Sequence, residues 1–225
     1  MKFSGLLKTS LIDYPNKISS VLYTPGCNLR CPFCHNWRIV LDPKPPFLQE
    51  IEALKILESR KKYIDAVVIT GGEPTMHDDL PNFIMKLKKK GFQVKLDTNG
   101  FYPEVLQACL PFVDYVALDI KTTTEKYFAL GAKTTIGLLY SINMLKMGKI
   151  PYEFRTTIVP KLITAEDVPQ IGELLAGGNN LVLQQYNSED TLDKAYEKIE
   201  PYSAEEIKKI AKTLEKFIKK ISLRL

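Results

Sequence analysis

The sequence predicts an α/β protein in which parallel strands alternate with helices. Apolar, β-branched runs recur along the 225 residues, and stretches with helical periodicity separate them. Polar and glycine-rich segments follow directly after these runs, where the carboxyl ends of parallel strands meet in α/β folds. Six such strands with right-handed crossovers form a sheet that stays open or closes in part as a barrel. The length suits one core, so we expect one domain over residues 1–225.

The predicted elements follow from these patterns in chain order. Runs such as Val67-Val68-Ile69 mark the strands, which we place at residues 20–24, 66–70, 93–97, 115–119, 153–159 and 181–185. The helical stretches between and after them lie at residues 48–60, 80–90, 103–109, 134–147, 165–175 and 204–221. The last helix has the clearest start, because Ser203 and Glu206 have the spacing of a capping box.

Composition excludes several classes of protein. The chain is 45% hydrophobic and 25% charged, which is ordinary for a globular protein. No apolar run approaches the roughly 20 residues that a membrane helix needs, so we expect no membrane span. A net charge of +5 is too weakly basic to indicate a nucleic-acid partner. The first residues resemble no targeting segment, so we expect a cytoplasmic protein.

Three of the four cysteines, Cys27, Cys31 and Cys34, lie on one short segment after the first predicted strand, with the spacing C-x3-C-x2-C. Three thiolates on a tight loop can hold a [4Fe–4S] cluster by three of its irons, whereas such clusters normally have four cysteine ligands. The fourth iron is then open to a substrate, as in a catalytic zinc site with one free position. Cys109 lies in an apolar helical segment, so core packing explains it better.

Other interpretations of this segment remain open at this point. The run Cys31-Pro32-Phe33-Cys34-His35 also fits a haem attachment motif, and its first four residues fit a redox-active pair. A structural zinc site is a third alternative, but it needs a fourth ligand from Cys109 or a histidine. The redox pair leaves Cys27 without a role, and haem attachment takes place outside the cytoplasm.

The ends of the other predicted strands are unusually polar. The second ends in Gly71-Gly72-Glu73-Pro74, the third in Asp97-Thr98-Asn99-Gly100, and the sixth in Gln184-Gln185-Tyr186-Asn187. The glycine pair is explained by a tight turn or by close approach of the backbone to a ligand. Asp119 ends an apolar strand, where an unpaired carboxylate is costly, and Lys121 follows two residues later. A ligand with both positive and negative groups would suit this rim.

Together these motifs resemble the radical S-adenosylmethionine superfamily, and within it the activating enzymes of glycyl-radical enzymes. The cysteine spacing, with Phe33 before Cys34, and Gly-Gly-Glu-Pro are the superfamily features. Residues 34–36 and 96–100 resemble pyruvate formate-lyase activating enzymes. Residues 10–15 and 183–186 resemble anaerobic ribonucleotide reductase activating proteins. The resemblance covers nearly the whole chain and implies a partial (β/α)6 barrel with a [4Fe–4S] cluster and S-adenosylmethionine at its carboxyl rim.

The resemblance also implies roles for individual residues. The expected cluster ligands are Cys27, Cys31 and Cys34, while the expected contacts of S-adenosylmethionine are Phe33 and His35 near the adenine, Gly71, Gly72 and Glu73 at the ammonium, and Lys121. A small monovalent cation is expected beside the cofactor carboxylate, held by Asp97, Thr98, the carbonyl of Ala117, and Asp119, because such a hard ion prefers oxygen ligands. Asn187 stands where pyruvate formate-lyase activators have a histidine, and we expect it as a replacement contact.

The implied reaction is reductive cleavage of S-adenosylmethionine to methionine and a 5′-deoxyadenosyl radical. The radical takes a hydrogen atom from a glycine of a partner glycyl-radical enzyme, with anaerobic ribonucleotide reductase as the first choice of partner. A flavodoxin or ferredoxin is the expected reductant. The alternatives are a radical enzyme acting on a small molecule or peptide, and an iron–sulfur electron carrier, which would have no use for the Asp97, Asp119 and Lys121 set.

Overall fold

The computed structural model describes all residues, 1–225, and contains one large sheet and one two-residue pairing. The strands are β1 (Lys2–Phe3), β2 (Gly5–Ser10), β3 (Ser19–Thr24), β4 (Leu48–Gln49), β5 (Ala66–Gly71), β6 (Gln93–Thr98), β7 (Tyr115–Asp119), β8 (Tyr152–Ile158), β9 (Leu181–Gln185) and β10 (Ile221–Arg224). The sheet has the order β10-β9-β8-β7-β6-β5-β3-β2, and β1 pairs separately with β4.

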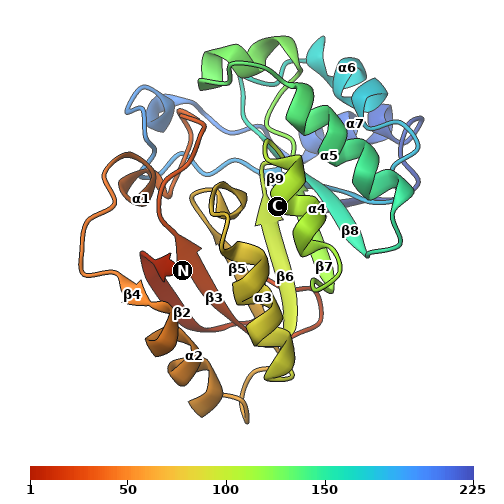
Figure 1. The fold of residues 1–225 in the computed structure, drawn as a ribbon. Helices are drawn as coiled ribbons and strands as arrows, with labels where there is room; N and C mark the ends of the chain where they lie inside the picture. The colour runs from red at the N-terminus through yellow and green to blue at the C-terminus, as the bar shows by residue number, and fades with distance from the viewer.

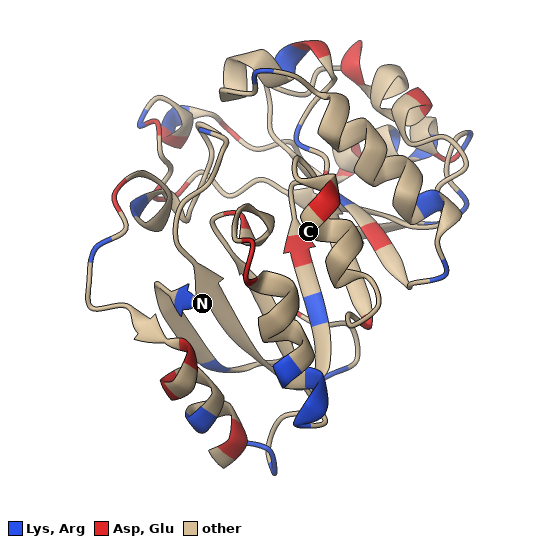
Figure 2. Cartoon of the chain, viewed as in Figure 1, with Lys and Arg blue, Asp and Glu red and all other residues tan.

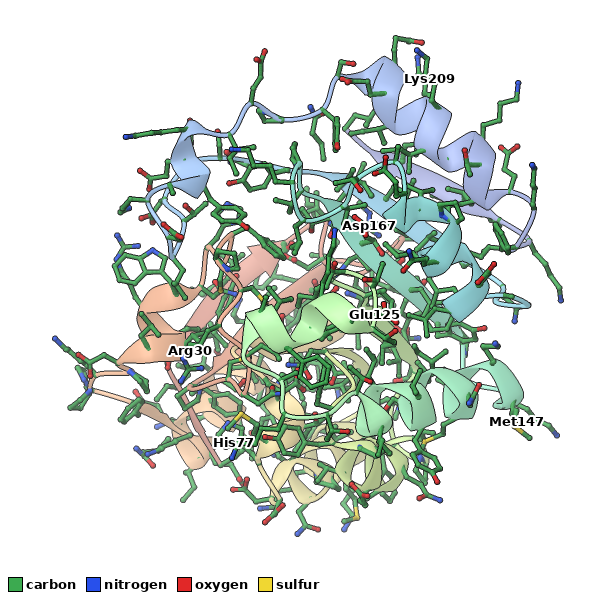
Figure 3. All side chains as sticks on the ribbon, turned by 90° about the horizontal axis from the view of Figure 1, so that it is seen from above. Arg30, His77, Glu125, Met147, Asp167 and Lys209 are labelled. Carbon is green, nitrogen blue, oxygen red and sulfur yellow. The ribbon has the colours of Figure 1, made fainter.

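The six predicted strands are confirmed as β3 and β5 to β9, and each lies within one residue of its predicted bounds. Neighbours from β3 to β10 pair in parallel, while β2 is antiparallel to β3. The two edge strands, β2 and β10, do not pair with each other, so the barrel is partial. Seen from above the carboxyl ends, the elements follow one another around an arc in chain order (Figure 3).

All helices but the first lie on the outer face of this arc, while the first lies beyond the carboxyl end of β3 (Figure 1). The helices are α1 (Trp37–Leu41), α2 (Glu50–Ser59), α3 (Leu80–Lys89), α4 (Pro103–Cys109), α5 (Ile136–Met147), α6 (Asp167–Leu174) and α7 (Ala204–Leu214), with three short 3-10 turns at Pro74–Met76, Glu125–Leu130 and Tyr196–Lys198. Val94 and Leu96 of β6 belong to the core beneath them. Cys109 is fully buried in the same core, as predicted. No helix has the length and apolar character required to cross a membrane.

The prediction was wrong at the end of the chain. The helix that begins at the Ser203 and Glu206 capping box ends at Leu214 rather than at residue 221. Residues 221–224 instead form β10, which pairs in parallel with β9. Ile218 still packs into the core from the turn between the two elements, so the apolar spacing imitates a longer helix. A strand forms here because the backbone of residues 221–224 can hydrogen-bond to the free edge of β9.

The inner face of the arc is closed near the amino ends of the strands. Tyr14, from the loop between β2 and β3, is 6% exposed and packs with Val21, Ala66 and Val68. Its ring centroid lies 5.8 Å from that of Tyr115. Alternation along a strand places Lys95 and Asp97 on this inner face, opposite Val94 and Leu96. The enclosed space is therefore filled below mainly by aromatic and apolar side chains, with buried Glu153 accepting a 3.1 Å bond from the Tyr115 hydroxyl. Above, toward the carboxyl ends, it is charged.

Candidate functional site

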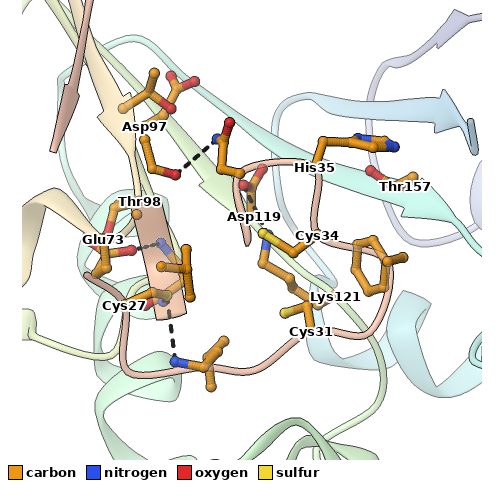
Figure 4. Close-up of a pocket in the computed structure, with 18 of the residues that line it drawn as sticks. Cys27, Cys31, Cys34, His35, Glu73, Asp97, Thr98, Asp119, Lys121 and Thr157 are labelled. Atoms are coloured by element: carbon orange, nitrogen blue, oxygen red, sulfur yellow. Dashed lines mark hydrogen bonds and ion pairs between the residues drawn. The ribbon is translucent and has the colours of Figure 1, made fainter. Parts of the chain in front are cut away.

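The carboxyl ends of the strands surround a cavity of about 210 Å³ (Figure 4). A buried water needs only about 10–15 Å³ measured in this way, so the space is large enough for a ligand. The lining comes from four strand ends and from the loop between β3 and α1: Cys27, Leu29, Cys31, Phe33, Cys34, His35, Asn36, Val40, Thr70, Gly71, Gly72, Glu73, Asp97, Thr98, Asn99, Asp119, Lys121, Arg155 and Thr157. All the predicted site residues except Ala117 and Asn187 therefore line one cavity.

The cysteine loop is fixed by backbone hydrogen bonds to other parts of the chain. The Arg30 amide donates to the Leu130 carbonyl at 2.7 Å, and the Asp193 amide donates to the Pro32 carbonyl at 2.9 Å. Within the loop, the Cys34 amide donates to the Cys31 carbonyl at 3.1 Å. The loop thus has a defined conformation that does not depend on disulfides, since all four cysteines are free.

The three thiols of this loop are poorly exposed, which affects their protonation. Burial raises the pKa of Cys27 to about 11 and that of Cys31 to about 12, and burial also raises the pKa of Cys34. A thiol binds iron as the thiolate, so cluster assembly must release these protons. The positive charge of bound iron compensates for the cost of burying thiolates.

The donor set fits a cluster better than a single ion. The three thiols line the cavity, yet no three His, Cys, Asp or Glu side chains converge on one point that a single metal ion would occupy. A cubane cluster presents iron at separate corners and so requires thiolates that are spread around it. Cys109 lies in α4 and not in the cavity lining, so it is no fourth ligand. The residues therefore fit a [4Fe–4S] cluster with one iron left open.

Gly71 and Gly72 allow two backbone segments to approach closely. The Gly72 amide donates to the Thr24 carbonyl at 2.9 Å, and the Glu73 amide donates to the Gly26 carbonyl at 2.8 Å. A Cβ on Gly72 would lie 1.7 Å from the Gly26 carbonyl oxygen. Gly71 has φ +111°, a conformation that favours glycine. The glycine pair therefore joins the end of β5 to the start of the cysteine loop.

Glu73 is 1% exposed, and its carboxylate is held by the protein. Oε1 accepts hydrogen bonds from the Thr75 amide at 3.0 Å, the Thr75 hydroxyl at 2.5 Å and the Thr98 hydroxyl at 2.7 Å. Oε2 accepts one bond from the Asn99 amide at 2.6 Å. Burial raises the pKa of Glu73 and outweighs these four hydrogen bonds. Because a carboxylate oxygen has two lone pairs, Oε2 retains one for a ligand.

Charged side chains form a continuous chain of contacts across the inner face of β6, β7 and β8. Figure 2 shows a blue and a red band on β6, the first of these strands. Lys95 donates to Asp97 at 2.5 Å, and Arg155 joins Asp97, at 3.1 Å, to Asp119, at 2.6 Å. Lys121 completes the chain with a 3.0 Å bond to Asp119. Burial would raise the pKa of Asp119, but Arg155 and Lys121 outweigh it and hold the pKa well below its usual range.

This charged ladder, Lys95–Asp97–Arg155–Asp119–Lys121, leads to a first prediction. Replacing Arg155 by Met leaves two poorly exposed carboxylates with one lysine each, so we expect the protein to lose about 3 kcal/mol of unfolding free energy. Urea unfolding of the cluster-free protein measures this loss. The control is Arg38→Met, which removes an exposed pair with Asp190, at 2.5 Å, and should change the midpoint little. Equal midpoints for the two variants would contradict a stabilising role of Arg155.

Asn187 is a predicted site residue that lies outside the cavity lining. It is exposed, and its side-chain Oδ1 accepts a bond from the Glu189 amide at 2.9 Å. Its backbone carbonyl lies 3.0 Å from Nε2 of His35. Asp190, in the same loop, pairs with Arg38 and accepts a 3.3 Å bond from the Trp37 indole. The loop between β9 and the 3-10 turn at Tyr196–Lys198 is thus attached to the cysteine loop and α1, and Asn187 takes part through its backbone.

Sequence reasoning assigned no role to several residues that the structure places at the cavity. The Asn36 amide group donates to the Gly71 carbonyl at 2.9 Å. The Asn99 amide group donates to Asn28 at 2.7 Å and lies 3.7 Å from the Cys27 sulfur. Asn36 directly follows His35, and Asn99 directly follows Thr98. This closeness to predicted site residues was the signal in the sequence that could have identified them. Arg155 and Thr157 had no predicted role either, and their spacing of two positions in a predicted strand, which puts them on one face, was the available signal.

This chain is similar to known proteins over most of its length. The Radical SAM superfamily model matches residues 21–175. A Methanocaldococcus jannaschii protein, whose name proposes a glycyl-radical enzyme activating enzyme, is 34% identical over 98% of this chain and 95% of its own. The pyruvate formate-lyase-activating enzyme of Clostridium pasteurianum is 28% identical over 94% of each chain.

Solved structures agree in fold. Streptococcus suis SuiB bound to its precursor peptide SuiA superposes with a TM-score of 0.69 at 16% identity, over 91% of this chain and 48% of that one. At this identity the likeness concerns the fold alone. The family match covers more than half of the chain and includes the cysteine loop and the Gly-Gly-Glu-Pro segment, and the family implies a [4Fe–4S] cluster and S-adenosylmethionine. The chain therefore belongs to the radical S-adenosylmethionine superfamily.

Proposed function

We propose that this protein activates a glycyl-radical enzyme by taking a hydrogen atom from a glycine of that partner. The observation that supports this most is the match over nearly the full length of both chains to a relative whose name proposes the same activity. The match to a pyruvate formate-lyase-activating enzyme also extends over both whole chains. The similarity therefore extends over the rim loops as well as the cysteine loop.

The cavity has the charges that such a reaction needs. When bound, the cluster and S-adenosylmethionine supply a one-electron cleavage and a carbon radical that removes hydrogen. Cys27, Cys31 and Cys34 would hold the cluster. The ladder has three cationic and two anionic side chains, so it suits the carboxylate of an amino acid, while the free lone pair of Glu73 suits its ammonium. These residues orient the cofactor and need not act as acid or base.

We propose anaerobic ribonucleotide reductase as the first partner to test. Residues 10–15 and 183–186 support it, because their sequences resemble activators of that enzyme. A pyruvate formate-lyase-like enzyme is the second, since the relatives include its activators but Asn187 departs from their histidine. A flavodoxin or ferredoxin is the proposed reductant. The net charge of +5 favours the approach of such acidic carriers.

The test is an anaerobic reaction with reductant, S-adenosylmethionine and each candidate partner. We expect slow cleavage of the cofactor by the protein alone. With the right partner we expect a glycine-centred radical, seen as a doublet in electron paramagnetic resonance. A partner deuterated at glycine should transfer deuterium into 5′-deoxyadenosine.

A matched control identifies the source of the radical. The Cys31→Ala variant, mixed with the same partner, should give no doublet, because the open iron site is lost. Cleavage of the cofactor without a radical on either partner would contradict the proposed function. The remaining candidate would then be a radical enzyme that acts on a small molecule or a peptide.

A further inference from the structure

The cation site implied by the family resemblance does not fit this chain. Asp97 Oδ1 already accepts a bond from Lys95 at 2.5 Å, and its Oδ2 accepts one from Arg155 at 3.1 Å. Asp119 Oδ1 faces Arg155 at 2.6 Å, and its Oδ2 faces Arg155 at 3.1 Å and Lys121 at 3.0 Å. Every carboxylate oxygen of the expected site is thus bonded to a cationic side chain of the protein.

The third expected cation ligand is used elsewhere. Thr98 follows Asp97 in β6, so its side chain points to the opposite face of the strand. Its hydroxyl donates to Glu73 at 2.7 Å and accepts from the Gly100 amide at 3.0 Å. Thr98 therefore belongs to the hydrogen-bond network around Glu73, and it leaves Asp97 without a neighbouring hydroxyl ligand.

Lys95 is the unusual member of the charged ladder. Its side chain is 1% exposed, and its ammonium donates to Asp97 alone. A buried lysine is costly, and a buried ion pair stabilises a fold no better than apolar residues of the same size. Folding alone therefore gives little reason for a lysine at this position. The position of Lys95 beside Asp97 suggests a reason for it. The lysine places a compact positive charge against the Asp97 carboxylate, which was expected to hold a metal ion.

The charges on the inner face point to the same role. Within the ladder, Lys95, Arg155 and Lys121 pair with Asp97 and Asp119, which leaves one positive charge in excess. Glu153, on the same face of β8, has its own partner in Arg224. A metal cation would increase that excess and would have to displace a protein cation. The carboxylate of S-adenosylmethionine would instead neutralise it. The side chains of the ladder therefore supply the positive charge that an anionic ligand needs, without an added ion.

We propose that Lys95 takes the place of the small monovalent cation, so that this enzyme binds S-adenosylmethionine without potassium or sodium. Lys95 acts through Asp97 and Arg155, and it is thus a positioning residue. The proposal depends on the family's cofactor and not on the identity of the partner, so failure to activate a glycyl-radical enzyme would leave it standing.

The test measures the dissociation constant of S-adenosylmethionine for the protein with its cluster, under anaerobic conditions. Potassium, sodium and tetramethylammonium chloride are compared at equal ionic strength, because ionic strength alone alters charge interactions. Wild-type protein should give the same constant in all three salts. A wild-type constant that improves with potassium or sodium would overturn the proposal, and this measurement needs no variant.

The variant Lys95→Met removes the charge and keeps a similar side-chain length. In tetramethylammonium we expect binding to weaken roughly ten- to a hundredfold, as for the loss of a hydrogen bond to a charged group. Potassium or sodium, which can enter beside Asp97, should restore part of it, whereas tetramethylammonium is too large. A purely structural lysine would not produce this dependence on the ion. If the Lys95→Met variant bound S-adenosylmethionine as tightly as wild type in all three salts, the proposal would also be overturned.

The control is Lys88→Met, which removes a lysine paired with Asp114 at 2.6 Å, outside the cavity lining. This variant should bind S-adenosylmethionine as wild type does in every salt. Iron content and far-UV circular dichroism show whether each variant is folded and loaded. If Lys95→Met does not fold, the wild-type comparison still decides the question.

Discussion

Replacing Cys31 by Ala is expected to abolish the cluster and with it all cleavage of S-adenosylmethionine. Cys31 is 7% exposed and lines the cavity, as do Cys27 and Cys34 on either side of it in the sequence. The loop offers only three thiols, and no other cysteine lines the cavity to replace one that is lost. A cluster held by two cysteines would leave two irons without protein ligands, whereas protein-bound clusters are normally held by four. The same loss is expected for Cys27→Ala and Cys34→Ala.

Iron analysis and the absorbance of anaerobically reconstituted protein measure this effect. Wild-type protein should hold about four irons, as expected of a [4Fe–4S] cluster. The matched control is Cys109→Ala, which changes the same residue type at the buried end of α4 and should keep the cluster. Loss of iron from Cys109→Ala as well would mean that the assignment of three ligands and an open iron is wrong.

The central strands were predictable because their sequence pattern has one interpretation. Buried parallel strands need apolar, β-branched residues on both faces, and runs such as Val67-Val68-Ile69 can hardly form anything else in an alternating α/β chain. The ends of the chain were less predictable. The backbone bonds between β10 and β9 form across 40 residues of separation in register, from Ile221 with Leu181 onward. The periodicity of a short sequence segment cannot reveal that a distant strand has a free edge to pair with.

The position of the site was predictable for a topological reason. Parallel strands end at the same rim, so Gly71, Asp97 and Asp119 had to lie near the cysteine loop. The hydrogen-bond partners of these residues were not predictable. Whether Asp97 binds a metal ion or a lysine depends on the rotamer of Lys95 and on the reach of Arg155 across β7 from β8. The reach of Arg155 follows from the register of the strands, which places Asp97 beside Ala117 and Asp119 beside Arg155.

His77 shows the same limit of sequence reasoning. Its polar neighbours in residues 76–79 indicate an exposed side chain. In the structure it is half-buried, and its Nε2 lies 3.1 Å from the carbonyl of Pro25. This contact attaches the segment after Glu73 to the residue before Gly26, next to the bonds that Gly72 and Glu73 make. The junction between β5 and the cysteine loop is therefore held at several points, all centred on a backbone approach that requires glycine.

Replacing Gly72 by Ala should consequently have a large effect at this junction. The added Cβ would lie 1.7 Å from the Gly26 carbonyl oxygen and 2.6 Å from the Gly26 carbonyl carbon. No side-chain rotation relieves a contact with backbone atoms, so the two segments must separate. Separation breaks the bonds from the Gly72 amide to Thr24 and from the Glu73 amide to Gly26. We expect a loss of roughly 3 kcal/mol in unfolding free energy, at the upper end of overpacking effects.

The consequence for function exceeds the consequence for stability, because the cysteine loop begins at Gly26. Its displacement moves Cys27 away from Asn99 and Glu73 away from the cavity. We therefore expect that any Gly72→Ala protein that still folds assembles the cluster incompletely and binds S-adenosylmethionine weakly. Gly5→Ala is the control, since its Cβ would meet only Tyr23, at an ordinary 3.9 Å. That variant should match wild type in urea unfolding, iron content and cofactor affinity. If Gly72→Ala also matched wild type, the close backbone approach would not be what places the cysteine loop at the cavity.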